Sequence, residues 1–392
     1  MAGRVTIRTP WRGAAAIFLL NGMVMGTWAG RIPAIAARFD LDEAGVGLLL
    51  LVLGVGAILA FPAAGRLTDR RGALPVMRIS MLGLLVSVAA AGLAPSLALL
   101  CIAVFCMGAL HGTTDVTMNA WASEVERQIE RPAMTAFHGM WSLGAGAGAL
   151  SGYAAAESGI GPGLHFTVVP VLGAALLLPL TLIPWQSDLR ERAADAPVFA
   201  VPRGVMLLVG LVALTAGLGE GAVTDWSALY LIDRAGLSEG RATLGYAAFS
   251  VTMVAGRLMA GQVIRAFGNV AVARAGALLG AAGMALVVWA PLPGIALAGF
   301  AAIGLGLAPI IPLVFSRAAT DPEISPGQGI ASVATLGYGA MLLGPPLLGA
   351  VADLASLRLA FVLVGLGLLV SAALAPVLRV PGARHAPVTR RG

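Results

Sequence analysis

The chain has 392 residues, of which 58% are hydrophobic and only 11% are charged, and its formal net charge is +6. An ordinary soluble domain carries roughly a quarter charged residues, so this composition excludes a water-soluble globular protein. A helix needs roughly 20 apolar residues to cross a bilayer, so the length fits about twelve spans and leaves little for a soluble domain.

Twelve apolar segments follow one another along the chain. The first six are predicted at residues 14–37, 44–64, 74–92, 97–120, 134–156 and 164–185. The last six are predicted at residues 205–231, 241–264, 271–290, 294–316, 327–351 and 355–378. The polar stretch 186–203 between them is interpreted as a cytoplasmic linker. We therefore expect an all-α integral membrane protein of two six-helix bundles, residues 1–185 and 204–392, the second ending in a short basic tail.

The arginines indicate the orientation of these spans. All 25 basic residues are Arg, and short loops rich in Arg stay on the cytoplasmic side of a membrane. With both termini inside, nineteen arginines fall in inner segments and four in outer segments, while Arg31 and Arg257 lie within spans. This asymmetry predicts that both termini are cytoplasmic. It also explains the positive charge, so we expect no nucleic-acid partner.

Residues of the same type recur in the two halves at an offset of 196 positions. The pairs are Gly65 and Gly261, Gly72 and Gly268, Gly108 and Gly304, and Gly148 and Gly344. Many membrane transporters are built from internal repeats, so the pattern predicts two pseudo-symmetric bundles.

A specific motif follows the second span, with the sequence Gly65-Arg66-Leu67-Thr68-Asp69-Arg70-Arg71-Gly72. It matches the G-x-L-x-D-R-x-G loop of the major facilitator superfamily at the same place in the topology, so the chain resembles that superfamily over nearly its whole length. The resemblance implies a secondary transporter and not an enzyme, with Gly65, Asp69, Arg70 and Gly72 acting in the gating loop. It also implies that Asp69 contacts the start of the eleventh span. The basic residues that often follow the motif are absent here.

Three shorter segments narrow the resemblance. They are Asp115-Val116-Thr117-Met118-Asn119, Phe137-His138-Gly139 with Ser142-Leu143-Gly144, and Glu220-Gly221 with Asp225-Trp226-Ser227. These segments are similar to the bacterial MosC-like branch, which implies a bacterial inner membrane and a small polar or amphipathic solute, sugar-like or similar. The fifth span lacks the Gly-Pro pair of drug antiporters, which disfavours a proton-driven drug or metabolite exporter but leaves it as an alternative. A membrane sensor that binds a solute without transporting it is a second alternative.

Ionisable side chains inside the spans are the candidate site residues, because each costs ~3 kcal/mol on insertion scales. Depths estimated from the helical rise place these side chains, together with the amide of Asn119, in two layers. The outer layer holds Arg31, Glu220 and Asp225, and the inner layer holds His111, Asp115, Asn119 and His138. We predict that Arg31 pairs with Glu220 or Asp225 and closes the outer side. The alternatives are that Arg31 reaches to the outer surface and that Asp225 is an ordinary charge at a helix end.

The predicted proton-carrying residue is Asp115, with Glu220 as second choice. His111, Asp115 and Asn119 are four residues apart and share one helix face. The alternative is that Asp115 pairs with His111, His138 or backbone groups and only holds the bundle together.

The remaining candidates are aromatic and amide side chains. Trp28, Trp141 and Trp226 are suited either to stacking on a ring-shaped ligand or to anchoring at the membrane surface. Asn21 either lines the cavity or makes an interhelix hydrogen bond.

Four prolines in spans ten and eleven, Pro309, Pro312, Pro345 and Pro346, are expected to bend those helices. The sequence contains no nucleotide-binding loop, zinc-ligand pattern or Ser-His-Asp arrangement, so we expect no cofactor or metal. We expect a monomer whose partners are a small-molecule substrate, protons and the lipid bilayer.

Overall fold

The computed structural model describes residues 8–130, 133–187, 202–289, 292–322 and 326–379. Within these ranges all regular structure is helical. The first half contains α1 (Pro10–Ala29), α2 (Ile32–Phe39), α3 (Glu43–Arg71), α4 (Ala73–Leu93), α5 (Leu97–Ile129), α6 (Met134–Glu157), α7 (Pro162–Leu177) and η1 (Leu178–Thr181). The second half contains α8 (Val205–Ala235), α9 (Glu239–Ala242), α10 (Leu244–Phe267), α11 (Asn269–Trp289), α12 (Pro293–Leu307), α13 (Ile310–Ala319), α14 (Pro326–Leu354), α15 (Leu357–Leu374) and η2 (Ala375–Leu378).

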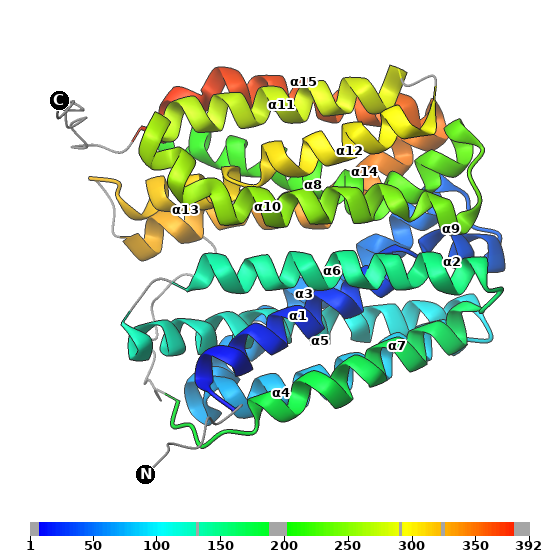
Figure 1. The fold of residues 1–392 in the computed structure, drawn as a ribbon, viewed down its shortest axis with the longest axis horizontal. Helices are drawn as coiled ribbons and strands as arrows, with labels where there is room; N and C mark the ends of the chain where they lie inside the picture. The colour runs from blue at the N-terminus through cyan, green and yellow to red at the C-terminus, as the bar shows by residue number, and fades with distance from the viewer. Residues whose placement is uncertain (1–7, 131–132, 188–201, 290–291, 323–325, 380–392) are drawn as a thin grey trace, which may run out of the picture.

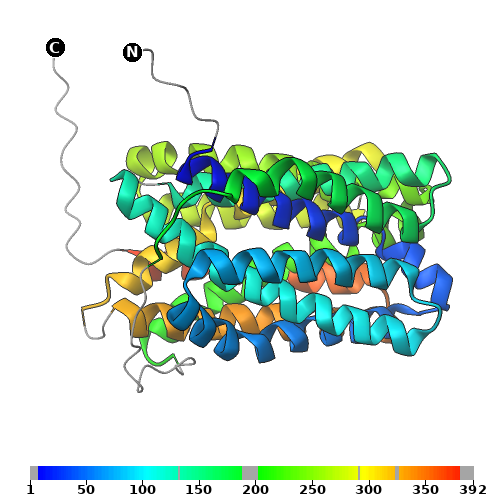
Figure 2. The same ribbon diagram turned by 90° about the horizontal axis from the view of Figure 1, so that it is seen from below.

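Most of these helices are long and apolar enough to cross a membrane. Eleven helical segments of the described chain meet that condition. The remaining long helix, α6, has 24 residues, which give it a length of ~36 Å at the α-helical rise. It runs alongside the others in both views (Figures 1 and 2). The structure thus confirms the predicted all-α membrane fold, and the linker and the basic tail lie mostly outside the described residues.

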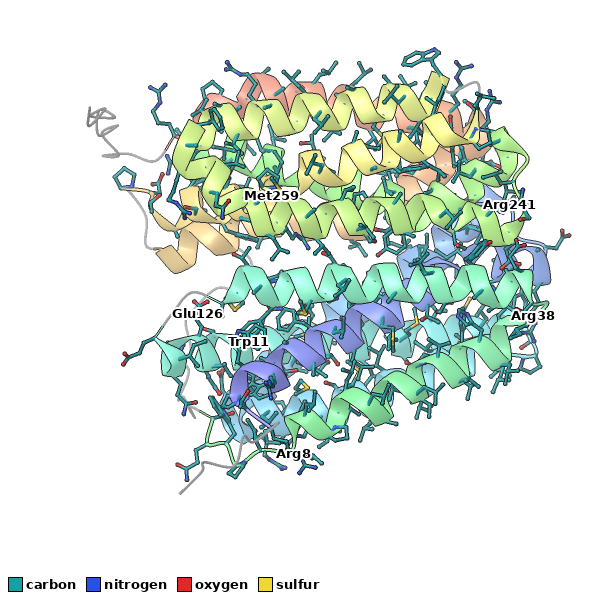
Figure 3. The ribbon with its side chains drawn as sticks, viewed as in Figure 1. Arg8, Trp11, Arg38, Glu126, Arg241 and Met259 are labelled. Atoms are coloured by element: carbon teal, nitrogen blue, oxygen red, sulfur yellow. The ribbon has the colours of Figure 1, made fainter. Side chains whose placement is uncertain are left out.

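The helices of the two halves lie side by side, those of residues 10–181 below and those of 205–378 above in Figure 1. Across the boundary α6 packs on α10 and α9, α3 packs on α14, and α2 contacts α8. We call the end of the molecule that carries α2 and α9 the outer end, and the end at which α1 begins the inner end. The inner end is the one predicted to face the cytoplasm. Figure 3 shows Arg38 and Arg241 at the outer end and Arg8, Trp11 and Glu126 at the inner end.

The helix boundaries of the two halves repeat. The starts of α3 and α9, of α4 and α11, and of α5 and α12 are each separated by 196 residues. The capping also repeats: Asp42 accepts a hydrogen bond from the Gly45 N–H at the start of α3, and Ser238 accepts one from the Arg241 N–H at the start of α9.

The ends of the matching helices adopt the same unusual backbone conformation. Gly72 after α3 has φ 86° and ψ 153°, and Gly268 after α10 has φ 79° and ψ 160°. Glycine adopts such positive φ values without steric cost. The predicted duplication is therefore visible in the backbone. The motif itself differs from the expected loop, because Gly65 to Arg71 continue α3 and only Gly72 makes the turn.

Helices α1 and α6 pack with their backbones in close contact. A Cβ atom added at Gly22 would overlap the carbonyl oxygen of Trp141, and one at Gly26 would overlap that of Ala145. Small residues permit this approach in membrane helices. The contact brings Asn21 of α1 next to the Trp141 indole.

Two spans are interrupted near prolines. The first breaks at Gly30 and Arg31, where Pro33 follows at the start of α2, and the tenth breaks between α12 and α13, where Pro309 lies. The break at Pro309 lies in span ten, where the prolines were expected to bend the helix. In span eleven, Pro345 and Pro346 lie inside an α14 that continues through them.

Candidate functional site

Arg31 joins the two halves at the outer end. Its Nε lies 2.5 Å from Oε1 of Glu239, the first residue of α9, as an ion pair that is not aligned as a hydrogen bond. Nη1 and Nη2 each donate to the carbonyl oxygen of Ile160, at 3.0 Å. Arg31 is 2% exposed, so it does not reach to the outer surface. The expected partners, Glu220 and Asp225, are replaced by Glu239, which the sequence places in an outer loop.

A second polar contact between the halves lies at the same end. Glu157, the last residue of α6, accepts a hydrogen bond of 3.0 Å from the Ser238 hydroxyl. Because Ser238 also caps α9, the start of α9 is held against α6 and Arg31 together.

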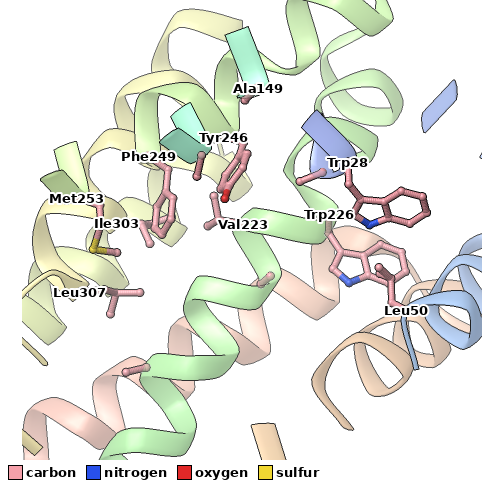
Figure 4. Close-up of a cluster of buried hydrophobic side chains, with 14 of the residues drawn as sticks. Trp28, Leu50, Ala149, Val223, Trp226, Tyr246, Phe249, Met253, Ile303 and Leu307 are labelled. Carbon is pink, nitrogen blue, oxygen red and sulfur yellow. The ribbon is translucent and has the colours of Figure 1, made fainter. Parts of the chain in front are cut away.

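Two of the predicted aromatic ligands are core residues at this end. Trp28 of α1 and Trp226 of α8 are 2% and 0% exposed, and they lie together near Leu50 of α3 (Figure 4). In this conformation neither ring faces an open cavity or the membrane surface. Trp28 packs on Phe166 of α7 with 5.8 Å between the ring centroids, so both tryptophans belong to the buried core at this end.

The third predicted aromatic, Trp141, belongs to a polar group deeper in the first half. Its indole Nε1 donates to Asn21 Oδ1 at 2.8 Å, and Asn21 Nδ2 lies 3.3 Å from Nδ1 of His111. Asn21 is fully buried and His111 is nearly so. The group links α1, α5 and α6, so Asn21 makes the interhelix hydrogen bonds that were one of its two expected roles.

Asp115 lies one turn beyond His111 on α5. Its Oδ1 accepts a hydrogen bond of 3.2 Å from Asn119 Nδ2, which also donates to the Asp115 carbonyl oxygen at 2.9 Å. Among the described side chains Asp115 forms no hydrogen bond with His111 or His138. Asp115 and Asn119 are both partly exposed.

A third polar group connects α6 with α8 and α10. Nη1 of Arg257 donates to the Ser142 hydroxyl oxygen at 2.6 Å and lies 3.5 Å from the carbonyl oxygen of His138. Nη2 of the same guanidinium lies 3.8 Å from Oε1 of Glu220. Glu220 therefore lies with His138 of the inner layer and not with Arg31. Glu220 and His138 were expected in different layers because the rise of the backbone alone does not include the reach of long side chains.

The other predicted residues have fewer contacts. Asp225 is partly exposed on α8, and Asp69 is partly buried in the last turn of α3 beside the exposed Arg70. Neither aspartate forms a hydrogen bond or ion pair with another residue of the described chain.

The sequence prediction missed Arg257, Glu239 and Ser142 as site residues. Arg257 carried a signal, since an arginine within a span is costly and marks a functional position. Its partner Ser142 is 115 positions away, and no sequence pattern links the two.

Comparison with known proteins agrees with this architecture. The sequence profile of the Major Facilitator Superfamily matches residues 14–325. The uncharacterised transporter y4wD of Sinorhizobium fredii is 47% identical over 371 residues, covering 95% of this chain and 98% of its own. The membrane protein MosC of Rhizobium meliloti is 31% identical over 363 residues, covering 91% and 87%. The crystal structure of the nucleoside transporter NupG superposes with a TM-score of 0.72 at 14% identity, covering 95% and 99%. The chain belongs to the major facilitator superfamily and is a membrane transporter of that type.

Proposed function

We propose that the protein is a secondary active transporter that moves a small polar or amphipathic solute, sugar-like in kind, by alternating access with proton coupling. The observation that carries this proposal is the ion pair of Arg31 and Glu239. It joins the two halves at the outer end, while polar side chains in the membrane interior stay partly exposed.

Alternating access requires closures that can open again. An ion pair between two bodies is suited to this role, because each charge can be hydrated once the bodies separate. The buried Trp28 and Trp226 strengthen the closure without a covalent or metal link. Opening the outer end would break contacts between the halves and leave the packing inside each half unchanged.

The polar interior supports a solute path. Asp115, Asn119, Glu220 and Arg257 are partly exposed within spans, where contact with lipid would be expensive. We infer that they face a water-accessible passage between the halves. Asp115 is our candidate for proton coupling, since each proton that crosses a potential of 100 mV supplies ~2.3 kcal/mol. We also propose a monomer in a bacterial inner membrane, and the arginine distribution supports the cytoplasmic placement of both termini.

The proposal is tested by finding a solute and then measuring its flux. Purified protein is screened for thermal stabilisation by sugars, inositols, amines and dyes, and each stabilising solute is tested for counterflow in proteoliposomes. We expect exchange flux of at least one stabilising solute. Stabilisation without flux for every such solute would instead indicate a sensor that binds but does not transport.

A further inference from the structure

We propose that Arg257 is the anion-binding residue of the transport site, where a carboxylate of the transported solute binds its guanidinium in competition with Glu220. The proposal rests on the transport function above and names the chemical class of the solute.

Only part of the hydrogen-bonding capacity of the Arg257 guanidinium is used. Nη1 has the Ser142 hydroxyl at 2.6 Å, whereas Nη2 lies 3.8 Å from Glu220 Oε1, beyond hydrogen-bond distance. Nε and Nη2 form no hydrogen bond with any described residue. These two nitrogens lie along one edge of the planar group, and such an edge binds the two oxygens of a carboxylate side by side.

The ion pair of Arg257 and Glu220 is partly accessible, and open space adjoins α8 next to it. The Arg257 and Glu220 side chains are 12% and 28% exposed, although both lie inside spans. A Cβ atom added at Gly221, the residue after Glu220, would meet nothing within 4 Å. We take this opening beside α8 as the side from which a ligand group would approach the pair.

The charges favour an acid over an amine. A guanidinium stays charged in proteins, whereas a carboxylate can be neutralised by a proton. Arg257 thus places a permanent positive charge inside the membrane without a carboxylate in hydrogen-bond contact. Oε1 of Glu220 is likewise buried without a hydrogen bond. A carboxylate on the free edge would complete the coordination of Arg257 and displace Glu220.

The location suits a transported ligand. Arg257 and Glu220 belong to the second half, and Ser142 belongs to the first. Ser142 also donates to the His138 carbonyl at 3.3 Å, so the hydroxyl that accepts from Arg257 is held in place. A carboxylate bound to Arg257 would lie at the boundary between the halves and contact a residue that connects them.

The test uses purified full-length protein and matched solute pairs. Glucuronate is compared with glucose, gluconate with sorbitol, and lactate with propane-1,2-diol, and glucosamine represents the amines. We expect at least one acid to raise the melting temperature more than its neutral partner does. Arg257→Gln should abolish this effect and Arg257→Lys should weaken it, while Glu220→Gln should lower the Kd of the acid several-fold because the competitor is gone. Arg274→Gln is the matched control, because Arg274 donates to the Ala372 carbonyl on α15, away from Glu220, and should bind like wild type.

Several results would overturn the assignment. They are equal stabilisation by acids and their neutral partners, stabilisation by the amine alone, no stabilisation by any acid, and undiminished binding by Arg257→Gln. Weaker acid binding by Glu220→Gln would also contradict the assignment, because a purely structural ion pair predicts that result. If Arg257→Gln fails to fold, the Glu220→Gln variant still decides the test. Flux assays separate the two proposals. If an acid binds but is not transported, only the proposal of transport is contradicted. If a neutral solute is transported and Arg257→Gln leaves that flux intact, only the Arg257 assignment is contradicted.

Discussion

Arg31 and Glu239 form an ion pair across the boundary between the two halves, with 2.5 Å between Nε and Oε1. The Arg31 side chain is 3% exposed and that of Glu239 is 31% exposed, so the arginine depends on its partners for solvation. Removing one member of a buried pair leaves the other charge uncompensated, whereas a surface pair contributes little. We therefore expect this pair to hold the outer end closed.

Arg31→Gln or Glu239→Gln should open the outer end more often. A loss of ~1.4 kcal/mol from the closed state would change its ratio to the open state about tenfold. The measurement is the rate at which a membrane-impermeant maleimide labels Ser227→Cys from outside, because Ser227 is 1% exposed beside Trp226. The free cysteines Cys101 and Cys106 are first replaced. Faster labelling is the expected result.

Arg38→Gln is the matched control for this experiment. Arg38 donates to the carbonyl oxygens of Gly92 and Ala94 at 2.6 and 2.7 Å, all within the first half, so its loss should leave the labelling rate unchanged. The charge swap Arg31→Glu with Glu239→Arg should restore part of the closed state. If the two changes are strictly additive, the pair does not act as a closure.

Gly26→Ala should destabilise the first half. The new methyl group would overlap the Ala145 carbonyl and push α1 away from α6, and overpacking of this kind costs ~1–3 kcal/mol. Gly294→Ala adds the same group where nothing lies within 4 Å and should be nearly neutral. Thermal unfolding in detergent compares the two variants. If Gly26→Ala and Gly294→Ala had equal melting temperatures, the close packing of α1 on α6 would not contribute to stability.

The spans were predictable because each carries its own signal. An apolar run of sufficient length must cross the bilayer as a helix, and the 196-residue offset between Gly72 and Gly268 indicates the duplication from residue positions alone. The hydrogen bond from Asn119 to Asp115 follows the four-residue spacing of a helix, so it too was within reach of the sequence.

The contacts between helices were not predictable in the same way. Arg31 was expected to pair with a residue inside span seven, but its partner Glu239 starts α9, 208 positions away. Arg257 was recognised only as an arginine within a span, because Ser142 and Glu220 come to it from two other helices. Such pairs depend on helix tilt and side-chain reach, which backbone depth alone does not contain.

Asp69→Asn should disfavour the conformation in which the outer end is open. Asp69 lies in the last turn of α3, where a negative charge opposes the helix dipole unless another group compensates it. We expect that group to be the start of α14 when the inner end closes. The variant should insert normally and transport more slowly in vesicles. Initial uptake equal to that of the wild type would contradict this role.

Asp115→Asn should abolish accumulation driven by a pH gradient and preserve solute exchange at equal pH. The amide can still bond with Asn119 but cannot carry a proton. Asp353→Asn, at an exposed position near the end of α14, is the control and should behave like wild type. Uphill accumulation by Asp115→Asn would make Asp115 structural and move attention to Glu220.

Alternating access itself is tested most directly by distances at the two ends of the same protein. Spin labels at Ala37 and Arg241 report the outer end, and labels at Gln128 and Arg265 report the inner end; all four positions are exposed and each pair joins the two halves. Pulsed dipolar spectroscopy is recorded in nanodiscs at two pH values, with and without a stabilising solute. We predict two populations in each pair that change in opposite directions, so that the inner distance shortens when the outer distance lengthens. Distances that change together at both ends, or a single unchanging distance in each pair, would contradict transport by alternating access.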